Sequence, residues 1–400
     1  MRIEDFTESA WARVVRSQGG VDCCLPQDLP APLPVTGDAL AALSAADRAV
    51  GQLAGIARIL PNPRLLIRAF AGREAVLSSR IEGTQASLSD LLLFDITPDA
   101  VETRSPDVLE VANYVRALEH GIARLRAIPL TLNLIRELHA ILLHNVRGSD
   151  RHPGKFRRVQ NWIGRHGVSI DRATYVPPPP ERLMEVLDAM ERFINTPGDL
   201  PLLVRIAMVH YQFEAAHPFE DGNGRVGRLL ISLMLDAERA IPYPVLYLSD
   251  YFERHQQAYY RHLLAVSQEG KWREWLTFVL RGVAEQAIDA VERSAKLMRL
   301  RDDWARQFQK ARASALLLRL LDALFVNPFI NMRRAADLLN VNPQSAQNSI
   351  DKLLEAGVLQ ELTGLKRNRI YVARDVLRTL EERPAFDQPA ASIPEATQWP

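Results

Sequence analysis

Apolar residues recur at helical spacing along most of the chain, and this pattern predicts a mainly α-helical protein. Helices are expected over residues 38–60, 64–82, 87–94, 105–126, 131–143, 181–194, 200–216, 229–240, 249–268 and 272–301. The segments 159–163 and 168–175 are expected to form a β-hairpin, which the proline run 177–180 ends. The proline-rich residues 1–36 are expected to lie extended over the surface.

The pattern changes near residue 311 to that of a second, smaller unit. Helices are expected over 315–325, 333–339 and 343–357, followed by strands over 358–362 and 369–372. Asn342 suits the N-cap of the third of these helices. Helices followed by a strand pair with a basic tip predict a winged helix. The four prolines after residue 381 predict a disordered tail.

Composition narrows the classes of function. The chain has 400 residues, of which 47% are apolar and 24% charged, with a net charge of +1. A balance so close to neutral excludes an overall field that draws the protein to nucleic acid or to a membrane. The adjacent Cys23 and Cys24 suit neither a disulfide nor a zinc site, which favours a reducing compartment. With no apolar leader and no long apolar stretch, the sequence predicts a cytoplasmic protein without a membrane partner.

The loop between the helices expected over 200–216 and 229–240 is unusually rich in polar chemistry. It carries a histidine, two carboxylates, three glycines, an asparagine and two arginines. Gly222 and Gly224 leave backbone N–H groups unobstructed where a helix begins, and such an N-terminus binds anions. Arg225 and Arg228 are three residues apart on that helix and share a face, so with the free amides they suit a polyphosphate.

Other residues of the loop fit a reaction on a nucleotide. Asp221 is a hard oxygen ligand, and Mg²⁺ is commonly held by one or two carboxylates together with substrate phosphates. Asn223 can donate to a phosphate or ligate the metal. His217 stands at the mouth of the loop, and histidine is the usual general base near neutral pH. Phe219 is apolar and is expected to anchor the loop in the core.

Three other interpretations of the loop explain less. A P-loop is excluded because the stretch lacks the Gly-Lys-Ser/Thr ending and follows a helix rather than a strand. A zinc site is disfavoured because one histidine and one aspartate do not make a tetrahedral centre. A capped turn whose arginines pair with Glu214 or Glu220 remains, but it explains neither the glycines nor the histidine.

The twelve residues from His217 to Arg228 resemble the motif of the Fic family, H-x-F-x-(D/E)-G-N-(G/K)-R-x-x-R, at every defined position. The likeness covers roughly residues 40–290. Within it, the segment 157–180 resembles the family's flap hairpin. The resemblance implies a helical Fic core with a small β-hairpin flap. It also implies a protein adenylyltransferase that transfers AMP from Mg-ATP to a Ser, Thr or Tyr hydroxyl of a target protein.

The family's roles are carried to the residues that match its motif. His217 would take the proton from the target hydroxyl, and Asp221 would hold Mg²⁺. Arg228 would bind the γ-phosphate, and the flap would contact the target backbone and the nucleotide. The nucleotide contacts implied are those of Ala173, Thr174, Tyr175, Asp221, Gly222, Asn223, Gly224, Arg225, Val226, Gly227, Arg228 and the tyrosine pair Tyr259 and Tyr260.

Gly224 bears on the type of transfer. Doc-type members, which phosphorylate their target by binding ATP in the reverse direction, resemble this motif but carry a lysine at the position. Glycine there favours AMP transfer. Removal of AMP and transfer of another phosphate-linked group stay open as alternatives.

Glu82 lies at an unexpected place, beside the last carbonyls of the helix expected at about 64–83. The helix dipole disfavours an anion there by about 0.3–1 kcal/mol. The stretch from Ser78 to Gly83 resembles the family's inhibitory motif, (S/T)-x-x-x-E-(G/N). The resemblance implies that Glu82 pairs with Arg228, occupies the γ-phosphate site and prevents a productive pose of ATP.

Four regions follow from these patterns. They are an N-terminal helical region with the inhibitory helix (1–100), a Fic catalytic core (101–290), a linker helix with the winged helix (291–380) and the tail (381–400). The winged helix offers polar side chains to bases and a basic tip to phosphates, namely Gln344, Ser345, Gln347 and Asn348, and Lys366, Arg367 and Arg369.

The role of the winged helix stays open. Residues 331–373 hold six basic and four acidic side chains, a thin electrostatic footprint for DNA. Dimerisation and docking of the target are equally good interpretations. The alternative function is therefore a DNA-binding regulator whose Fic domain senses nucleotide. The resemblance leaves room for self-modification and for a homodimer.

Overall fold

The computed structural model describes residues 1, 3–31, 35–59, 64–97, 105–164, 167–310, 315–365 and 367–382. The chain forms two compact units, Met1–Val291 and Glu292–Pro400. Among the described residues, no helix is both long enough and apolar enough to cross a bilayer. Part of the basic tip predicted for the second unit, Lys366, and nearly all of the tail fall outside the described residues.

The first unit is helical, as the apolar spacing predicts. Its helices are α1 (Asp38–Ile59), α2 (Arg64–Ile81), α3 (Leu88–Ile96), α4 (Pro106–Arg124), α5 (Leu132–Leu142), α6 (Leu183–Asn195), α7 (Leu202–Ala216), α8 (Asn223–Ala237), α9 (Ser249–Arg254), α10 (Gln256–Glu269) and the first part of α11 (Trp272–Lys310). One correction concerns the helix expected over 249–268, which is two helices separated at His255. No glycine or proline marks this break, so the apolar period continues across it.

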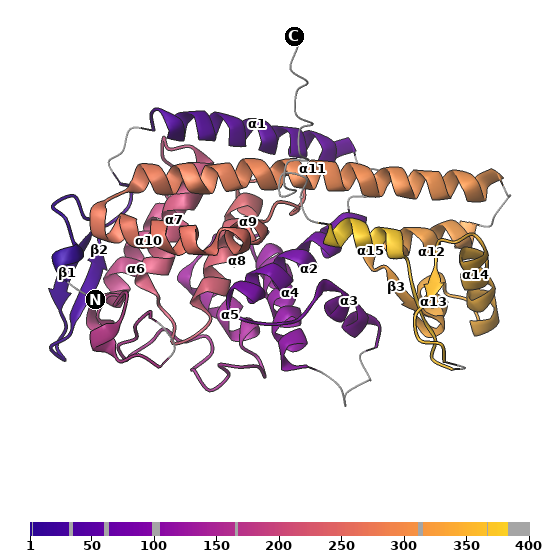
Figure 1. Cartoon of the computed structure of the whole chain (residues 1–400), viewed down its shortest axis with the longest axis horizontal. Helices are drawn as coiled ribbons and strands as arrows, with labels where there is room; N and C mark the ends of the chain where they lie inside the picture. The colour runs from indigo at the N-terminus through magenta and orange to yellow at the C-terminus, as the bar shows by residue number, and fades with distance from the viewer. Residues whose placement is uncertain are drawn as a thin grey trace, which may run out of the picture. The chain divides into compact units, whose positions relative to one another are not determined.

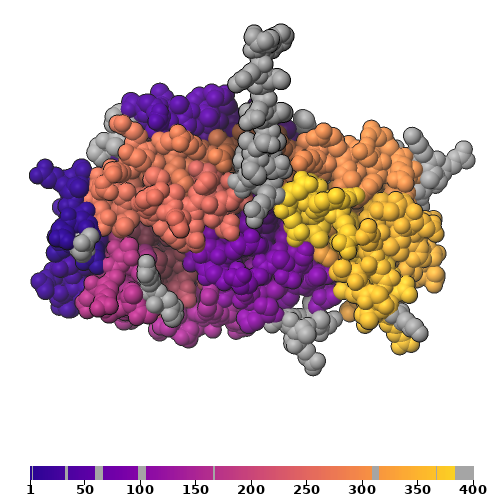
Figure 2. Space-filling view, in the orientation of Figure 1, coloured from indigo at the N-terminus to yellow at the C-terminus, as the bar shows by residue number. Residues whose placement is uncertain are grey.

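The chain begins with a hairpin that the sequence pattern did not predict. Strands β1 (Ala12–Arg16) and β2 (Asp22–Pro26) pair antiparallel, with Val14 opposite Cys24. Figures 1 and 2 show this hairpin in indigo at one end of the first unit. The backbone N–H of Cys24 donates to Val176 O (2.8 Å), so the second strand is tied to the segment that leaves the flap. The strands were not predicted because the region is rich in proline, which usually indicates a turn or a sheet edge.

The flap hairpin is shorter than predicted. Among the described residues of 157–180, a single β-bridge joins Ile163 to Tyr175, and Ile170–Arg172 forms a turn of 3₁₀ helix. Side chains of this segment bond to the motif loop instead of facing a partner strand. Asn161, for example, donates through Nδ2 to Phe219 O (2.9 Å). Bonds to another part of the chain therefore replace the ladder that two full strands would have formed.

The motif loop lies at the centre of the first unit, between α7 and α8. These two helices pack against each other, and α8 also contacts α2, α4 and α5, as Figure 1 shows. Phe219 is fully buried in this centre, where its ring stacks on that of His139 with 3.7 Å between centroids. The expectation that Phe219 anchors the loop is confirmed.

The second unit contains helices and one small sheet. Its elements are α12 (Ala315–Val326), β3 (Phe329–Asn331), α13 (Met332–Leu339), α14 (Pro343–Glu355), β4 (Gln360–Glu361), β5 (Ile370–Val372) and α15 (Arg374–Glu381), and the strand order is β3-β5-β4, all antiparallel. Asn342 caps α14 as predicted, accepting from Ser345 N at 2.9 Å. The strand β3 and the helix α15 were not predicted. The assignment as a winged helix and its role stay predictions.

Phe219→Ala should destabilise the first unit by about 3–5 kcal/mol, because it removes a buried ring and leaves a cavity beside His139. The free energy of unfolding is measured by urea titration. Ile288→Ala, at a side chain that is 40% exposed, is the control and should cost less than about 1 kcal/mol. Equal losses in the two variants would contradict the anchoring role.

Candidate active site

Two left-handed residues shape the loop between α7 and α8. His217 caps the C-terminus of α7 with φ 44° and ψ 60°, and Gly222 precedes α8 with φ 78° and ψ 7°. Glycine adopts this conformation freely, whereas a histidine there costs on the order of 1–3 kcal/mol. The loop therefore holds its histidine in a strained backbone that neighbouring contacts must maintain.

Asn223 closes the loop on itself. Its Oδ1 accepts from Phe219 N and its Nδ2 donates to Phe219 O, both at 2.8 Å. Asn223 is 2% exposed, and each of its two polar atoms makes one of these bonds. The amide keeps a second N–H and a second lone pair, so the expectation that this side chain binds a phosphate or a metal ion stays a prediction. Its role there is to hold the turn that presents the start of α8.

The start of α8 offers unsatisfied backbone donors. The first N–H groups of an α-helix have no partner within the helix. Among the described residues, none accepts a hydrogen bond from the backbone N–H groups of Asn223, Gly224 or Arg225. With the positive end of the helix dipole, these three amides form a place for an anionic oxygen.

His217 has the protonation state of a general base. Its Nδ1 lies 3.4 Å from Glu214 O, so this nitrogen carries the proton that it donates to the carbonyl, and Nε2 keeps its lone pair. Burial and then the charge of Arg157 lower the pKa of His217 to about 4. The imidazole is therefore neutral at physiological pH, as a base must be before it takes a proton.

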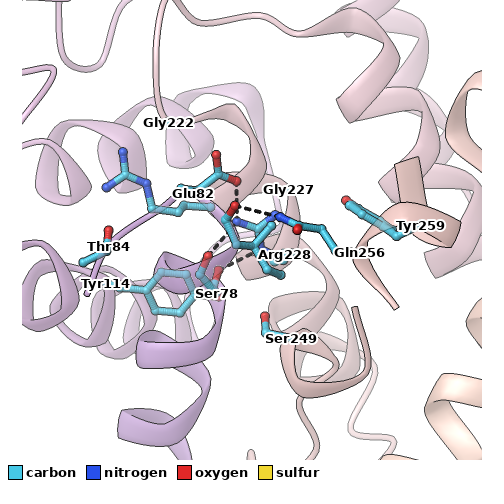
Figure 3. A network of polar contacts seen from close by, with 12 residues as sticks. Ser78, Glu82, Thr84, Tyr114, Gly222, Gly227, Arg228, Ser249, Gln256 and Tyr259 are labelled. Carbon is cyan, nitrogen blue, oxygen red and sulfur yellow. Dashed lines mark hydrogen bonds and ion pairs between the residues drawn. The ribbon is translucent and has the colours of Figure 1, made fainter. Parts of the chain in front are cut away.

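Arg228 is held by the end of α2, and Figure 3 shows these contacts. Its Nη2 donates to Glu82 Oε1 (2.7 Å) and to Ser78 O (3.0 Å), while Nε donates to Ser78 Oγ (2.8 Å). The ion pair that the sequence led us to expect between Glu82 and Arg228 is thus present. Burial alone would raise the pKa of Glu82, but the charge of Arg228 and its hydrogen bond outweigh burial and lower it.

Gly224 leaves the space that this ion pair occupies. A Cβ at Gly224 would lie 2.3 Å from Glu82 Oε1 and 2.9 Å from Arg228 Nη1. Any side chain at this position would collide with the carboxylate. Gly224 is therefore required by the ion pair itself, a reason that the sequence alone did not provide.

Arg225 is occupied by an acidic residue that the sequence analysis missed. Its side chain is 1% exposed, and Nη1 donates to Glu110 Oε2 at 3.3 Å. Glu110 also accepts from Thr84 Oγ1 at 2.9 Å and from Arg147 Nη2 at 3.5 Å. In the sequence Glu110 looks like one more charged residue of an amphipathic helix. Its burial becomes visible only when the helices are packed.

The guanidinium of Arg225 is therefore less available to phosphates than the sequence suggests. Its Nη2 lies 3.7 Å from Asp221 Oδ1, and its Nε has no partner among the described residues. A ligand oxygen that reached this nitrogen would satisfy a buried donor.

Asp221 fits a magnesium site only if a substrate completes it. The side chain is 38% exposed, and its Oδ1 accepts from Gly222 N at 2.6 Å. Among the described residues there is no cluster of three or more His, Cys, Asp or Glu side chains that would hold a metal by themselves. One carboxylate with phosphate oxygens and waters as the remaining ligands is the arrangement that suits Mg²⁺.

His139 supports the same loop from α5. Its Nε2 donates to Asp221 O at 3.0 Å, and its Nδ1 accepts from Gly154 N at 2.8 Å. These two bonds specify the neutral tautomer. Burial lowers the pKa of His139 to about 4. His139 is therefore a buried residue of the core that also contacts the loop.

The two tyrosines of the pair differ in their exposure and contacts. Tyr259 is 1% exposed and its hydroxyl lies 2.9 Å from Nε2 of His210, whose Nδ1 lies 3.1 Å from Gly227 O. Tyr260 is 47% exposed and is the member of the pair that a ligand can reach. His210 thus connects Tyr259 to the backbone of α8.

The remaining predicted contacts are mostly buried. In the flap, Ala173 and Tyr175 point inward and only Thr174 exposes its side chain. Tyr175 donates through its hydroxyl to Ala215 O at 3.1 Å, next to the end of α7. Val226 is fully buried in the core. Nucleotide contacts by Ala173, Tyr175 and Val226 would therefore have to use backbone atoms.

Comparison with known proteins bears on the family. Residues 40–123 match the Fic/DOC family N-terminal description, and residues 129–235 match the Fic/DOC family. Both matched ranges lie within the first unit. The motif loop lies inside the Fic domain and Glu82 inside the N-terminal domain, whereas Tyr259 and Tyr260 lie beyond both matched ranges.

Curated relatives and a solved structure are similar to parts of this chain. Proteins named "Protein adenylyltransferase Fic" from Drosophila sechellia and Drosophila yakuba are 31% and 32% identical to this chain over 203 residues, half of its length. The chain covers only 38% and 37% of those relatives. A crystal structure of a Fic family protein from Desulfovibrio desulfuricans G20 shares the fold. Its TM-score is 0.56 at 18% identity, and the match covers 86% of this chain and 98% of that one.

Acid should destabilise the Fic domain in part through His139. Its pKa is about 4 in the folded protein, below the ordinary value of 6.5, so the unfolded chain takes up this proton first. The contribution of His139 to the free energy of unfolding is fully present above pH 6.5 and is lost as the pH falls from 6.5 toward 4. Between pH 7.5 and pH 5.0 the loss from this group is about 2 kcal/mol.

Urea unfolding at the two pH values measures this loss. His139→Gln should reduce the acid-induced drop in the free energy of unfolding by about 2 kcal/mol. His144→Gln, at an exposed position of the following turn, is the matched control and should keep the wild-type dependence. A drop in His139→Gln as large as that of the wild type would contradict the prediction.

Proposed function

We propose that the protein is a protein adenylyltransferase, which transfers AMP from Mg-ATP to a Ser, Thr or Tyr hydroxyl of a target protein. The observations that carry the proposal are the neutral His217 at the start of the motif loop and the free amides that begin α8 at its end. The name of the Drosophila relatives supports the same reaction. The alignment of base and phosphate-binding amides would supply most of the rate.

The proposed step uses few groups. Nε2 of His217 takes the proton of the target hydroxyl, the hydroxyl oxygen attacks the α-phosphorus, and pyrophosphate leaves. The amides of Asn223, Gly224 and Arg225 stabilise the charge on the phosphate oxygens. Asp221 would hold Mg²⁺, which would neutralise further phosphate charge when bound.

We propose further that Glu82 inhibits this reaction. Its carboxylate occupies Arg228 and fills the space above Gly224. The γ-phosphate of ATP would need the same guanidinium, so carboxylate and phosphate exclude each other. Displacement of the end of α2 would then be required before ATP adopts a productive pose.

Glu82→Gly should raise AMP transfer by roughly 10- to 100-fold, the range expected when one competing ionic contact of about 1.4–2.7 kcal/mol is lost. His217→Ala should abolish transfer in both the wild type and the Glu82→Gly background. Incorporation of label from ATP into protein, at saturating Mg-ATP, is the measurement.

Arg80→Gly is the matched control for this substitution. Arg80 lies at the same end of α2, but its side chain is exposed, so this variant should transfer AMP at the wild-type rate. The proposal of inhibition would be wrong if Glu82→Gly and the wild type had equal rates. Activity that survives His217→Ala would overturn the assignment of the base.

Other Fic chemistries and partners belong to the same proposal. The mass of the modified protein separates AMP transfer from transfer of another phosphate-linked group, and incubation with a modified target tests removal of AMP.

We place the reaction in the cytoplasm, where ATP is available and where the two buried free thiols, Cys23 and Cys24, stay reduced. The modified protein would be a separate target or a second copy of this chain.

The second unit supports the alternative of a DNA-binding regulator only through exposed polar residues. Gln344 and Asn348 of α14 are exposed, and they hydrogen-bond to each other at 3.0 Å. A salt-dependent mobility shift with duplex DNA, without label transfer from ATP, would favour this alternative.

A further inference from the structure

Arg157 is a buried cation whose acceptors are backbone carbonyls. It is 3% exposed. Its Nε donates to His217 O at 3.0 Å, and its Nη2 donates to Pro178 O at 2.5 Å and to Ala216 O at 3.3 Å. A longer contact joins Nη1 to Val159 O at 3.4 Å. Among the described residues, no carboxylate lies within ion-pair distance of this guanidinium.

Burying an arginine without a carboxylate partner costs free energy, so the side chain must make other contacts. The backbone carbonyls that accept its hydrogen bonds provide these contacts. The carbonyls of Ala216 and His217 are at the C-terminal end of α7, where the last carbonyls have no partner within the helix. A cation at this end also interacts favourably with the helix dipole. Arg157 therefore stabilises the helix end on which the base is mounted.

The same side chain connects this helix end to the flap. Pro178 lies in the proline run that follows the flap, and the backbone N–H of Arg157 donates to Pro218 O at 2.9 Å. Asn161 adds a bond through Nδ2 to His217 O at 3.2 Å. The carbonyl of His217 thus receives two side-chain donors from the segment that begins the flap.

We propose that Arg157 is a positioning residue, which maintains the left-handed backbone of His217 and aligns its imidazole with the start of α8. The inference rests on the proposed function, since the aligned base is that of AMP transfer. His217 adopts φ 44°, a conformation that costs on the order of 1–3 kcal/mol and that needs external contacts to persist. Arg157 supplies the shortest of the side-chain contacts to its carbonyl.

The charge of Arg157 has a second effect on the base. It stands beside the imidazole and disfavours imidazolium, while Glu82 at the end of α2 favours it. The other carboxylates near the loop are engaged elsewhere: Glu220 pairs with His152 at 3.0 Å, and Asp221 accepts from Gly222 N. Glu214, on α7, accepts a hydrogen bond from Nδ1 through its backbone carbonyl, and burial raises the pKa of its carboxyl to about 7. Burial is the larger cause of the low pKa of His217, and the charge of Arg157 adds to it.

Two substitutions separate geometry from charge, both made in the Glu82→Gly background. Arg157→Lys keeps the charge but has a single ammonium, which cannot reach three carbonyls as the planar fork does. It should lower kcat about 10-fold and leave the pKa of His217 within a few tenths of a unit. Arg157→Gln removes both the positive charge and the planar guanidinium. It should lower kcat about 100-fold and raise the pKa of His217 by about one unit.

The pKa of His217 is measured by NMR titration of its imidazole, and kcat and KM for ATP by label transfer. KM should change less than twofold in both variants, because Arg157 contacts the helix end and not the anion site. Arg158→Gln, at the exposed neighbouring residue, is the matched control and should match its parent in every measurement. A loss of kcat without a change in KM is the signature of a misaligned base.

The outcomes are distinguishable. If Arg157→Gln folds and neither the pKa nor kcat changes, the proposal is overturned. If Arg157→Gln does not fold, Arg157→Lys decides: unchanged kcat overturns the proposal, and a loss of kcat at constant KM supports it. If the Glu82→Gly parent transfers no AMP, the proposed function fails. The titration of His217 then still tests Arg157, since an unchanged pKa in Arg157→Gln contradicts its effect on the base.

Discussion

The burial of two guanidinium groups on one face of α8 is the constraint on which the first unit depends. Arg225 and Arg228 are 1% and 2% exposed, and a charge so deep in the protein is costly unless it is paired or hydrogen-bonded. Neighbouring helices supply the partners. The end of α2 provides Ser78 and Glu82 for Arg228, and α4 provides Glu110 for Arg225. The packing of these helices around α8 is therefore an electrostatic arrangement as well as an apolar one.

The burial of Arg228 also determines which partners can replace Glu82 at this contact. The Arg228 side chain is 1% exposed and that of Glu82 is 32% exposed, so loss of the carboxylate would leave a buried guanidinium without a charged partner, which costs free energy. A polyphosphate that displaced Glu82 would bring its own negative charge and avoid this loss. The guanidinium can therefore exchange a carboxylate for a phosphate far more easily than it can remain alone. On the proposed function, Glu82 and a nucleotide phosphate would exchange at this one arginine.

The histidine depends on a different set of contacts. Its backbone is strained, and donors from the flap segment, Arg157 and Asn161, hold its carbonyl. Below the loop, His139 and Phe219 form the stacked pair on which it rests. Glycines complete the arrangement where backbones or carboxylates come close: a Cβ at Gly227 would lie 2.3 Å from Glu214 Oε1. The loop is thus specified by its neighbours as much as by its own residues.

The sequence alone determined the helical class and most helix bounds to within a few residues, and it singled out the stretch from His217 to Arg228, because apolar periodicity and a dense local motif are properties of neighbouring residues. It was wrong about the start of α8, at Asn223 rather than residue 229, and about the end of α11, at Lys310 rather than residue 301. It also indicated that Glu82 would meet Arg228, since a motif on each side connects them. The tertiary structure alone decided that Glu110 neutralises Arg225, that Asn223 closes its own loop, that a single β-bridge joins the described residues of the flap and that Arg157 binds the carbonyl of His217. Each of these depends on groups tens of residues apart or on which partner wins a hydrogen bond. The packing of the helices decides which partner forms each hydrogen bond, and a local sequence pattern does not predict that choice.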